Sequence, residues 1–366
     1  MKLMVNGLDL AEAVSTVARV TSAKAINPML EGIKMIAEGD TLTLVATDLE
    51  MYIQKVIRAD VKAKGTVIVP GKLFAEYARK LESAQVSVTA DGNSIVVGHG
   101  ENAFNFTGMP VEEFPEVISL TKSPHFTIKS EELKDFVSKC KIAVAEDDAR
   151  PILKGICCEI VGNKLTGVAL DGFRLSKVEK AIDNSVGDTK VIIPAKSLEE
   201  VRKLLADDSG EVNVVIEDKF FQVQVGGATF ASRMIEGEFI NYKQIIPAAF
   251  TSDVVVEKAA FVQAIDRAGL LVRSDKINLV TLKVADKQVH ITSNNEIGKI
   301  NEKVSASLTG KDVVISFNAK YLFDALRATN SEFIKLCFNG DLAPMVMVDA
   351  KQGDYLFLVL PVRLQG

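Results

Sequence analysis

The sequence predicts an α+β protein built from three copies of one domain, because one motif occurs in it three times. Each copy of the motif is an apolar, β-prone run, a small residue, a lysine and a segment of helical apolar periodicity. That order predicts a strand that leads directly into a helix. The motif covers residues 67–74, 191–198 and, more weakly, 314–322. Its lysines, Lys72, Lys196 and Lys320, are separated by two equal gaps of 124 residues, which unrelated segments would rarely keep.

The first copy, residues 1–121, is expected to open with a short strand and a helix. Leu10, Val14 and Val17 form the apolar face of that helix. Strands are expected over residues 32–37, 41–47, 51–59 and 67–70, before the second helix. Strands over residues 86–89, 94–98 and 103–106 then form a meander, with Asp91-Gly92 as a hairpin turn.

The second copy, residues 122–248, and the third copy, residues 249–366, repeat this order. Leu133 and Val137 follow Leu10 and Val14 by 123 residues, and the run ending at Asp171 follows the run ending at Asp48 by the same offset. A further 123 residues lead to Asn294. Each copy therefore contains two helices and about eight strands, mostly antiparallel by their hairpin signals, and the fold class is α+β.

Composition limits the possible functions. The chain has 366 residues, 48% of them hydrophobic, a formal net charge of −5 and a pI of about 5.5. This balance excludes a generally basic nucleic-acid binder, so any nucleic-acid surface must be local. The four cysteines have no paired spacing, which indicates reduced thiols and a cytoplasmic location. We expect no signal peptide, because the N-terminus leads directly into a periodic pattern, and no membrane contact, because no apolar run is long enough to span a bilayer.

The motif lysine lies in the first turn of each predicted helix. A helix N-terminus disfavours a cation by a few tenths to about 1 kcal/mol. Three such lysines at matching positions suggest that negative charge comes from outside the chain, and phosphate is the natural candidate. The alternative is an exposed lysine that is tolerated three times.

No catalytic constellation is evident. The three histidines, His99, His125 and His290, belong to no metal-binding pattern, and phosphate-loop, dinucleotide-binding and nucleophile-elbow motifs are absent from the sequence. The pairs Asp147-Asp148 and Asp207-Asp208 are expected to be solvated loop charges. We therefore predict no catalytic residue, no metal and no cofactor, and interpret the chain as a binding protein or scaffold.

Several short segments together carry a resemblance to a known family. They are Thr47–Met51, Val69-Pro70, Glu113–Pro115, Asp171–Leu175, Phe239–Pro247 and Leu360–Leu364. Over essentially its whole length the chain resembles the bacterial DNA polymerase III β subunit, the sliding clamp. The resemblance implies three clamp domains per chain and a ring in which two chains join head to tail around duplex DNA.

Simple geometry agrees with that ring. Twelve helices spaced by about 9 Å form a circle about 35 Å across, which leaves about 25 Å inside the helices. A duplex about 20 Å wide fits with a layer of water. On this resemblance the DNA-facing residues are Lys72, Lys196 and Lys320 on the lining, with Lys24 and Arg150 at positions where the family contacts DNA. Asp147 replaces a polar residue beside them.

The resemblance also implies a peptide-binding cleft between the second and third domains. We expect apolar walls with two arginines as polar anchors, a character suited to Leu and Phe anchors of a partner peptide. The matching residues are Leu153, Leu170, Gly172, Phe173, Arg174, Leu175, Ile240, Gln244, Ile245, Pro344, Met345, Val359, Leu360, Pro361, Val362 and Arg363. Leu170, Phe173, Ile240 and Gln244 depart from the commonest family pattern, which predicts an altered motif preference.

The family's dimer interface joins the first domain of one chain to the third domain of the other. The matching residues are Phe104 and Phe106, which alternate on one strand face, and Leu270 and Leu271, which end a helix. Implied partners are a second copy of the chain, double-stranded DNA without sequence preference, the DNA polymerase III catalytic subunit, the clamp loader, and other polymerases and repair proteins with short clamp-binding motifs.

The resulting hypothesis is a non-enzymatic processivity clamp that tethers a polymerase to DNA and raises its effective concentration at the primer end. One alternative is a triplicated protein-interaction scaffold that uses the same cleft, stays monomeric and does not encircle DNA. Another is an enzyme with an unrecognised site.

Overall fold

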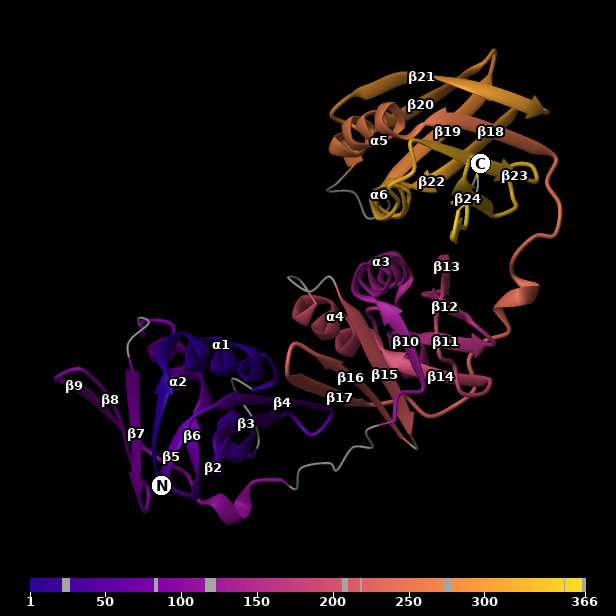
Figure 1. The fold of residues 1–366 in the computed structure, drawn as a ribbon. Helices are drawn as coiled ribbons and strands as arrows, with labels where there is room; N and C mark the ends of the chain where they lie inside the picture. Colours follow the sequence, from indigo (N-terminus) through magenta and orange to yellow (C-terminus); the bar gives the residue numbers. More distant parts are fainter. Residues whose placement is uncertain are drawn as a thin grey trace. The chain divides into compact units, whose positions relative to one another are not determined.

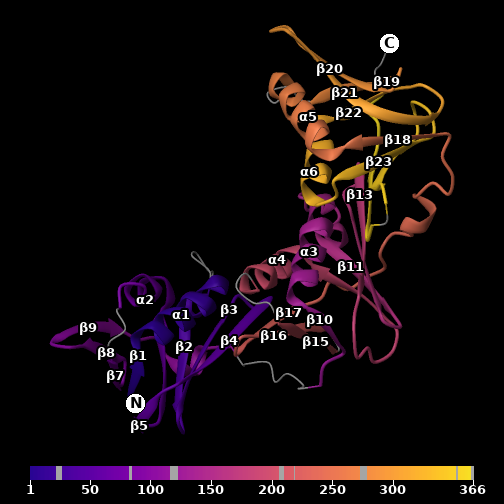
Figure 2. The same ribbon diagram turned by 45° about the horizontal axis from the view of Figure 1, so that its top comes forward.

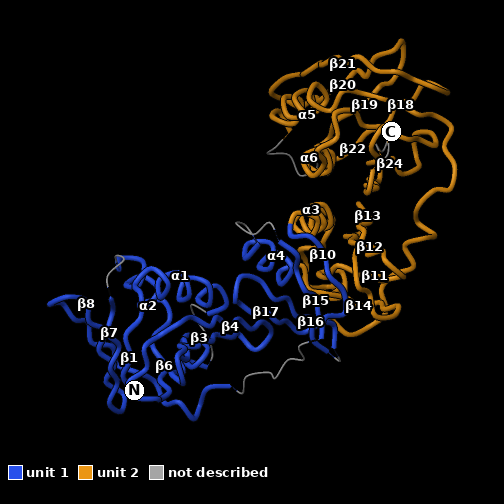
Figure 3. Tube along the Cα trace, in the orientation of Figure 1, with its two compact units in different colours: residues 1–130, 196–234 blue, residues 131–195, 235–366 orange. Residues whose placement is uncertain are grey.

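The computed structural model of the chain describes residues 1–21, 27–81, 85–115, 123–205, 210–217, 219–272, 278–351 and 353–363. These residues form two compact units (Figure 3). Unit 1 contains residues 1–130 and 196–234, and unit 2 contains residues 131–195 and 235–366. The second repeat thus contributes to both units, and each unit is described by itself below.

Six helices and twenty-five strands make up the described chain, in the order that the triplication predicts (Figure 1). The elements of the first repeat are β1 (Lys2–Asn6), α1 (Gly7–Val17), β2 (Gly32–Glu38), β3 (Thr41–Thr47), β4 (Met51–Arg58), β5 (Asp60–Ala63), β6 (Gly65–Pro70), α2 (Gly71–Ala78), β7 (Gln85–Asp91), β8 (Ser94–His99) and β9 (Asn102–Thr107). The 3₁₀ turns η1 (Ala18–Val20), η2 (Pro28–Glu31) and η3 (Val111–Glu113) interrupt its loops.

The second repeat has the same order of helices and strands, except that β5 has no counterpart among its described residues. They are β10 (Phe126–Lys129), α3 (Ser130–Cys140), β11 (Gly155–Val161), β12 (Lys164–Leu170), β13 (Arg174–Ala181), β14 (Thr189–Pro194), α4 (Ala195–Leu204), β15 (Glu211–Glu217), β16 (Phe220–Val225) and β17 (Ala228–Arg233). Its 3₁₀ turns are η4 (Lys141–Ala143), η5 (Pro151–Lys154) and η6 (Tyr242–Gln244).

The third repeat follows the same pattern again. Its elements are β18 (Ser252–Glu257), α5 (Lys258–Val272), β19 (Leu279–Ala285), β20 (Gln288–Asn294), β21 (Lys299–Gly310), β22 (Val313–Asn318), α6 (Ala319–Ala328), β23 (Phe333–Phe338), β24 (Met345–Asp349) and β25 (Tyr355–Val359). The predicted α+β class with three repeated domains is confirmed. The domain boundaries near residues 121 and 248 remain predictions, and residue 121 lies outside the described residues.

Unit 1 is built on two antiparallel sheets. One has the strand order β5-β1-β7-β8-β9 and the other the order β10-β15-β16-β17-β4-β3-β2-β6. The second sheet crosses from one repeat to the next, because β17 pairs with β4, with Phe230 opposite Ile53. Helices α1 and α2 pack against each other.

Unit 2 contains one antiparallel sheet of twelve strands. Its order is β14-β11-β12-β13-β25-β24-β23-β18-β21-β20-β19-β22. The crossing between repeats is made here by β25, which pairs with β13 and places Phe357 opposite Ser176. Helices α5 and α6 lie side by side against each other, as the views of Figures 1 and 2 agree. No helix among the described residues is long and apolar enough to cross a membrane.

Asparagine side chains cap the starts of α1 and of the motif helix α6. The Asn6 side chain caps α1 by accepting from the backbone N–H groups of Leu8 and Asp9, and Asn318 caps α6 by accepting from Lys320. Alternating burial in strands such as β7, whose pattern places Val86 and Val88 in the core, fits a sheet with one face buried.

One repeat equivalence differs from the prediction by a residue. Asp48, Asp171 and Asn295 each accept hydrogen bonds at Oδ1 from the backbone N–H groups two and three residues later. The third copy of this turn is therefore centred on Asn295, not on Asn294 as the 123-residue offset predicted. Asn294 instead ends strand β20.

Candidate DNA-binding and partner-binding sites

The three motif lysines occupy the same local position. Lys72, Lys196 and Lys320 are each the second residue of their helix, in α2, α4 and α6. Lys196 Nζ lies 3.6 Å from Asp48 and Lys320 Nζ lies 3.9 Å from Glu146, and more than half of each side chain is exposed. Such long, solvated pairs contribute little to stability, so these ammonium groups stay available to an external anion.

Of the other two predicted DNA contacts, Arg150 lies among the described residues and Lys24 does not. Arg150 is exposed and precedes η5. Asp147 lies three residues before Arg150 in the same loop. Its side chain accepts a hydrogen bond from the backbone N–H of Ala149 and so orders the loop locally.

Unit 2 brings the predicted peptide-site residues together at the ends of paired strands. Arg174 begins β13 opposite Val359 of β25, Met345 begins β24 opposite the same residue, and the N–H of Leu360 donates to the carbonyl of Phe173. These three strands thus collect segments that are distant in sequence. The remaining contributors come from the end of β12, from η5, from η6 and from the C-terminal segment.

Burial divides this set into a floor and a rim. The floor is almost fully buried and consists of Leu153, Leu170, Leu175, Met345 and Val359. The rim is exposed and contains large apolar side chains, Phe173 at 60% exposure and Ile240 and Ile245 at 37% each. Gly172, Gln244 and Arg363 are exposed beside them, while Pro344, Leu360, Pro361 and Val362 are half-buried. An apolar surface with such a rim suits a partner's apolar anchors.

Arg174 differs from the exposed polar anchor that the sequence predicted. It is 9% exposed, and its Nε donates to Asp171 while its Nη1 donates to Asp324, at 2.9 and 2.6 Å. Its guanidinium also lies 4.5 Å from the ring centre of Tyr321. The residue therefore fastens the turn before β13 to helix α6, and Arg363 is the exposed arginine of the set.

Tyr321 and Asp324 belong to this region and escaped the sequence analysis. Phe173 stacks on Tyr321, with ring centres 6.2 Å apart and an interplanar angle of 25°. Burial raises the pKa of the Tyr321 hydroxyl. Tyr321 directly follows the motif lysine in α6, and Asp324 lies about one turn further along. Helical periodicity alone places each residue on a face of α6 and does not say what packs there.

The matching place in unit 1 is closed by the chain's own side chains. There Met29, Val45, Tyr52, Ile68 and Phe114 form one buried cluster. Tyr52 occupies the strand position of Leu175, one residue after the start of β4 as Leu175 is one residue after the start of β13. Tyr52 packs into this cluster and is 6% exposed, whereas Phe173, Ile240 and Ile245 of unit 2 keep apolar surface exposed.

The predicted dimer residues have unequal exposure. Phe106 is 2% exposed and packs edge-on against Phe74 at 5.4 Å, whereas Phe104 is half-buried and contacts Tyr77 at 5.1 Å. Leu270 near the end of α5 is 57% exposed, and Leu271 is half-buried. Phe104 in unit 1 and Leu270 and Leu271 in unit 2 thus keep apolar surface exposed, and Phe106 packs beside Phe104 with ring centres 4.4 Å apart.

A group of charged side chains in unit 2 has the form of an ion-pair network. Glu132, Asp135 and Asp354 place carboxylate oxygens within 4.8 Å of one another. Lys139 and Lys180 lie among them, with Lys139 Nζ at 2.6 Å from Asp135 and 2.9 Å from Asp354. Burial opposes charge on Lys180, but hydrogen bonds to the three carboxylates raise its pKa. The two ammonium groups offset two of the three carboxylate charges, and each of the three acids pairs with at least one lysine.

Comparison with known proteins agrees with this arrangement. Models of the N-terminal, central and C-terminal domains of the DNA polymerase III β subunit match residues 1–118, 127–241 and 243–363. A beta sliding clamp from Halalkalibacterium halodurans is 31% identical, over 96% of each chain. The chain belongs to the DNA polymerase III β subunit family. Its function is accordingly that of a DNA sliding clamp.

Solved structures of sliding clamps have the same fold. The DNA polymerase sliding clamp of Bacillus subtilis superposes with a TM-score of 0.97 at 28% identity, over the whole of both chains. The sliding clamp of Pseudomonas aeruginosa bound to griselimycin gives a TM-score of 0.93 at 25% identity, again over both whole chains. These members of the family favour the clamp over a scaffold that does not encircle DNA.

Proposed function

We propose that two copies of the chain close head to tail into a ring around duplex DNA and tether the replicative polymerase there. The ring holds the DNA polymerase III catalytic subunit, the clamp loader and other polymerases and repair proteins through short motifs. It contributes no catalytic residue of its own and acts in the cytoplasm. Four buried, free cysteines are consistent with a reducing compartment.

Two unpaired strand edges carry the proposal. Strand β4 is paired by β17 and strand β13 is paired by β25, so two repeat crossings are made within the chain. Strand β21 is the counterpart of β4 and β13 in the third repeat. Its residues 299–305 pair with β20 on one side and, among the described residues, with no strand on the other. Strand β9 is the counterpart of β17 and β25 in the first repeat, and among the described residues it pairs only with β8. A second copy can supply each missing neighbour, and two copies then close both edges.

The strand register at the two crossings within the chain predicts which residues face each other when β9 of one copy pairs with β21 of the other. Each of β9, β17 and β25 carries a phenylalanine at its third position: Phe104, Phe230 and Phe357. Phe230 and Phe357 are 1% exposed beneath the strand they pair with, whereas Phe104 is half-buried. Ile53 and Ser176 lie opposite the two buried rings, and counting from the Asn295 turn gives Ile300 as the residue that would lie opposite Phe104.

The basic residues support loose contact with DNA. Lys72, Lys196 and Lys320 share one helix position, on a chain of net charge −5, and the ion pairs of Lys196 and Lys320 are long and solvated. A ring holds DNA by topology, so a few screened charges are sufficient and allow sliding. In unit 2, the apolar rim at Phe173, Ile240 and Ile245 supports binding of partner peptides with apolar anchors.

The mass of the native particle tests the closed pair. We expect sedimentation to give twice 39.6 kDa for the wild type and the monomer mass for Ile300→Asp, because the substitution places a charge against Phe104 of the other copy. Val161→Asp is the control, since Val161 is 58% exposed at the end of β11 and no contact with a second copy is proposed there. A monomeric wild type at all concentrations would favour the scaffold.

A further inference from the structure

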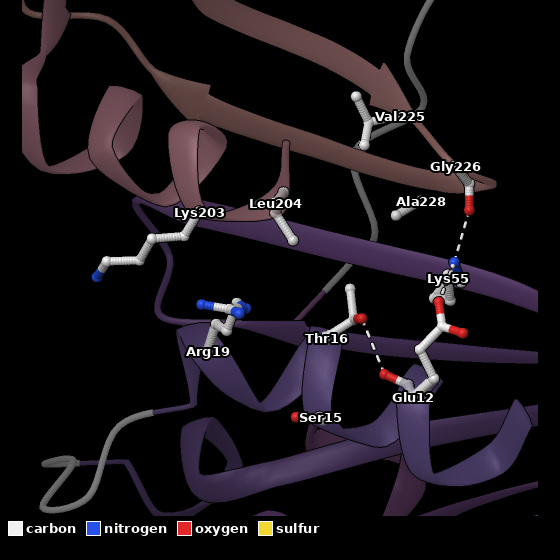
Figure 4. A pocket seen from close by; sticks show the side chains of 10 residues that line it. All are labelled: Glu12, Ser15, Thr16, Arg19, Lys55, Lys203, Leu204, Val225, Gly226 and Ala228. Atoms are coloured by element: carbon white, nitrogen blue, oxygen red, sulfur yellow. Dashed lines mark hydrogen bonds and ion pairs between the residues drawn. The ribbon is translucent and has the colours of Figure 1, made fainter. Parts of the chain in front are cut away.

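Unit 1 contains a cavity of about 580 Å³ where its two repeats meet (Figure 4). One wall is the C-terminal half of α1, and the others are the end of α4 and the hairpin of β16 and β17. The lining residues are Glu12, Ser15, Thr16, Arg19, Lys55, Lys203, Leu204, Val225, Gly226 and Ala228. None of them belongs to the sites described above.

The corresponding place in unit 2 shows what the cavity lacks. Ala228 opens β17 and lies opposite Lys55 of β4, and Tyr355 opens β25 and lies opposite Val178 of β13. The two crossings have the same register, since Phe230 and Phe357 follow two residues later. The helices match as well, because α1 and α3 have equal length and their 3₁₀ turns follow directly, which aligns Thr16 with Lys139.

In unit 2 the Tyr355 ring fills this place. It stacks on Phe357 with ring centres 4.7 Å apart, and Lys139 Nζ lies 5.2 Å from its centre. Its hydroxyl lies 3.0 Å from Ser331 Oγ. In unit 1 a methyl group, that of Ala228, occupies the position of this ring, and Phe230 lies beneath it, 1% exposed. The first crossing therefore retains the phenylalanine on which the ring stacks, has Thr16 in place of Lys139, and lacks the ring.

The charges around the cavity favour a neutral ring over an anion. Lys55 Nζ donates to the carbonyl of Gly226 at 2.5 Å and to Glu12 at 3.2 Å. Glu200 pairs with Lys203 at 2.7 Å and, more loosely, with Arg19 at 4.0 Å. These two acids and the negative ends of α1 and α4 offset the three cations. Cations that face a cavity still attract the face of an electron-rich ring.

Size agrees with this chemistry. A cavity of about 150 Å³ is enough to hold benzene, so this one takes a substituted ring and the chain that carries it. Leu204, Val225 and Ala228 supply apolar contact, while Thr16 and Arg19 supply polar groups for a ring hydroxyl. Thr16 Oγ1 donates to the carbonyl of Glu12 and keeps its lone pairs for an incoming hydroxyl donor.

We propose that this cavity binds a phenol-type aromatic ring, supplied by a small molecule or by a tyrosine side chain of a partner, in the place that Tyr355 fills in unit 2. Such a ligand contacts both repeats and holds their crossing together. The proposal does not depend on the chain's encircling DNA. It adds a ligand site to unit 1 on the evidence of unit 2.

Calorimetric titration of the full chain tests the proposal, with p-cresol as the first probe. We expect one saturable site, with binding at least about threefold weaker for 4-methylcyclohexanol, which has a similar shape and no π-system. A blocked tripeptide, acetyl-Gly-Tyr-Gly-amide, is the second probe. Tighter binding of the tripeptide identifies a tyrosine-bearing partner as the source, and binding of p-cresol alone identifies a small molecule.

Two variants and a matched control make the test specific. Ala228→Tyr supplies the ring from within and should weaken p-cresol binding at least tenfold, whereas Thr229→Tyr adds the same ring on the opposite face of β17 and should leave binding unchanged. Arg19 is more exposed than Ala228, and Arg19→Gln removes a cation that faces the cavity, so it should weaken binding about threefold. The proposal is overturned if p-cresol binding does not saturate or if p-cresol and 4-methylcyclohexanol bind equally well. Equal binding of p-cresol by wild type and all variants would overturn it too.

Discussion

Phe104 and Phe106 alternate on β9 and have different surroundings, although the sequence predicted one role for both. Phe106 is enclosed by Phe74 and Tyr77, with ring centres at 5.4 and 5.7 Å. Phe104 keeps part of its surface exposed. Burial against the chain's own α2 therefore places Phe106 in the core of unit 1, and we expect Phe104 to be the ring that contacts a second copy.

The two alanine variants should separate these roles. Phe106→Ala is expected to lower the free energy of unfolding by about 3–5 kcal/mol, because it leaves a cavity in a packed core. Phe104→Ala should lower it by about 1–2 kcal/mol and mainly weaken the association of two copies. Urea unfolding and sedimentation of both variants check this. A larger loss of unfolding free energy in Phe104→Ala than in Phe106→Ala would contradict the assignment.

Phe173 is the exposed ring at the predicted peptide site, and its stacking on Tyr321 positions it there. Phe173→Ala should weaken binding of a short peptide with Leu and Phe anchors by about threefold to tenfold, because the peptide would cover an exposed ring on the rim of the site, and truncating an aromatic side chain that becomes buried on binding costs about 1 kcal/mol. Leu342→Ala is the control, since Leu342 is 63% exposed and lies outside the predicted site. Fluorescence anisotropy with a labelled peptide measures both, and equal affinities would remove Phe173 from the site.

At the scale of elements, the network of Lys139, Lys180 and Asp354 joins α3 and β13 to the loop before β25. Burial alone would raise the pKa of Asp354, but hydrogen bonds from the two lysines hold that pKa below its ordinary value. The contribution of this carboxylate to stability is therefore complete above about pH 4, the ordinary pKa of an aspartate, and is lost as the pH falls through the lowered folded-state pKa.

Asp354→Asn should remove this contribution. We expect the variant to lose about 1–3 kcal/mol of unfolding free energy at pH 7, because two buried ammonium groups lose a partner, and to show a shallower loss of stability between pH 5 and pH 3. Asp60→Asn, in an exposed pair with Lys62, is the control. Urea midpoints measured across this pH range check it. The idea fails if Asp354→Asn and wild type lose stability in parallel as the pH falls.

The elements that follow from local sequence were predictable, and those set by pairing between repeats were not. The lysine motif predicted the starts of α2, α4 and α6, and hairpin signals predicted meanders such as that of β7 and β8. The true third turn at Asn295 differs from the prediction because a constant offset cannot register a one-residue insertion. The buried state of Arg174 depends on Asp324, which is 150 residues away in the chain, so spacing gave no sign of it.

The same limit applies to the cavity in unit 1. Its existence depends on a difference between Ala228 and Tyr355 at matching positions of two crossings. Sequence periodicity treats both as apolar strand residues. Only the register of β17 on β4 and of β25 on β13 shows that they occupy equivalent places. The membership of the peptide site stays a prediction from the resemblance, and the division of those residues into a buried floor and an exposed rim needed the fold.

At the scale of the whole molecule, encirclement of DNA requires that two copies close into a ring. Two repeat crossings are made within the chain, and the edges of β9 and β21 are left for a second copy. An acidic chain with a few weakly paired lysines at helix starts can then surround DNA without gripping it. Affinity for DNA is thereby replaced by topology, and partners gain from proximity to the duplex.

Retention on circular and linear DNA tests this central claim most directly. The chain would be loaded by its clamp loader onto a nicked circular plasmid, separated from free protein by gel filtration at about 0.2 M salt, and measured again after one cut linearises the plasmid. The account predicts that the protein stays with the circle and leaves the linear form within the time of the experiment. Equal retention on both forms, or equal loss from both, would contradict encirclement.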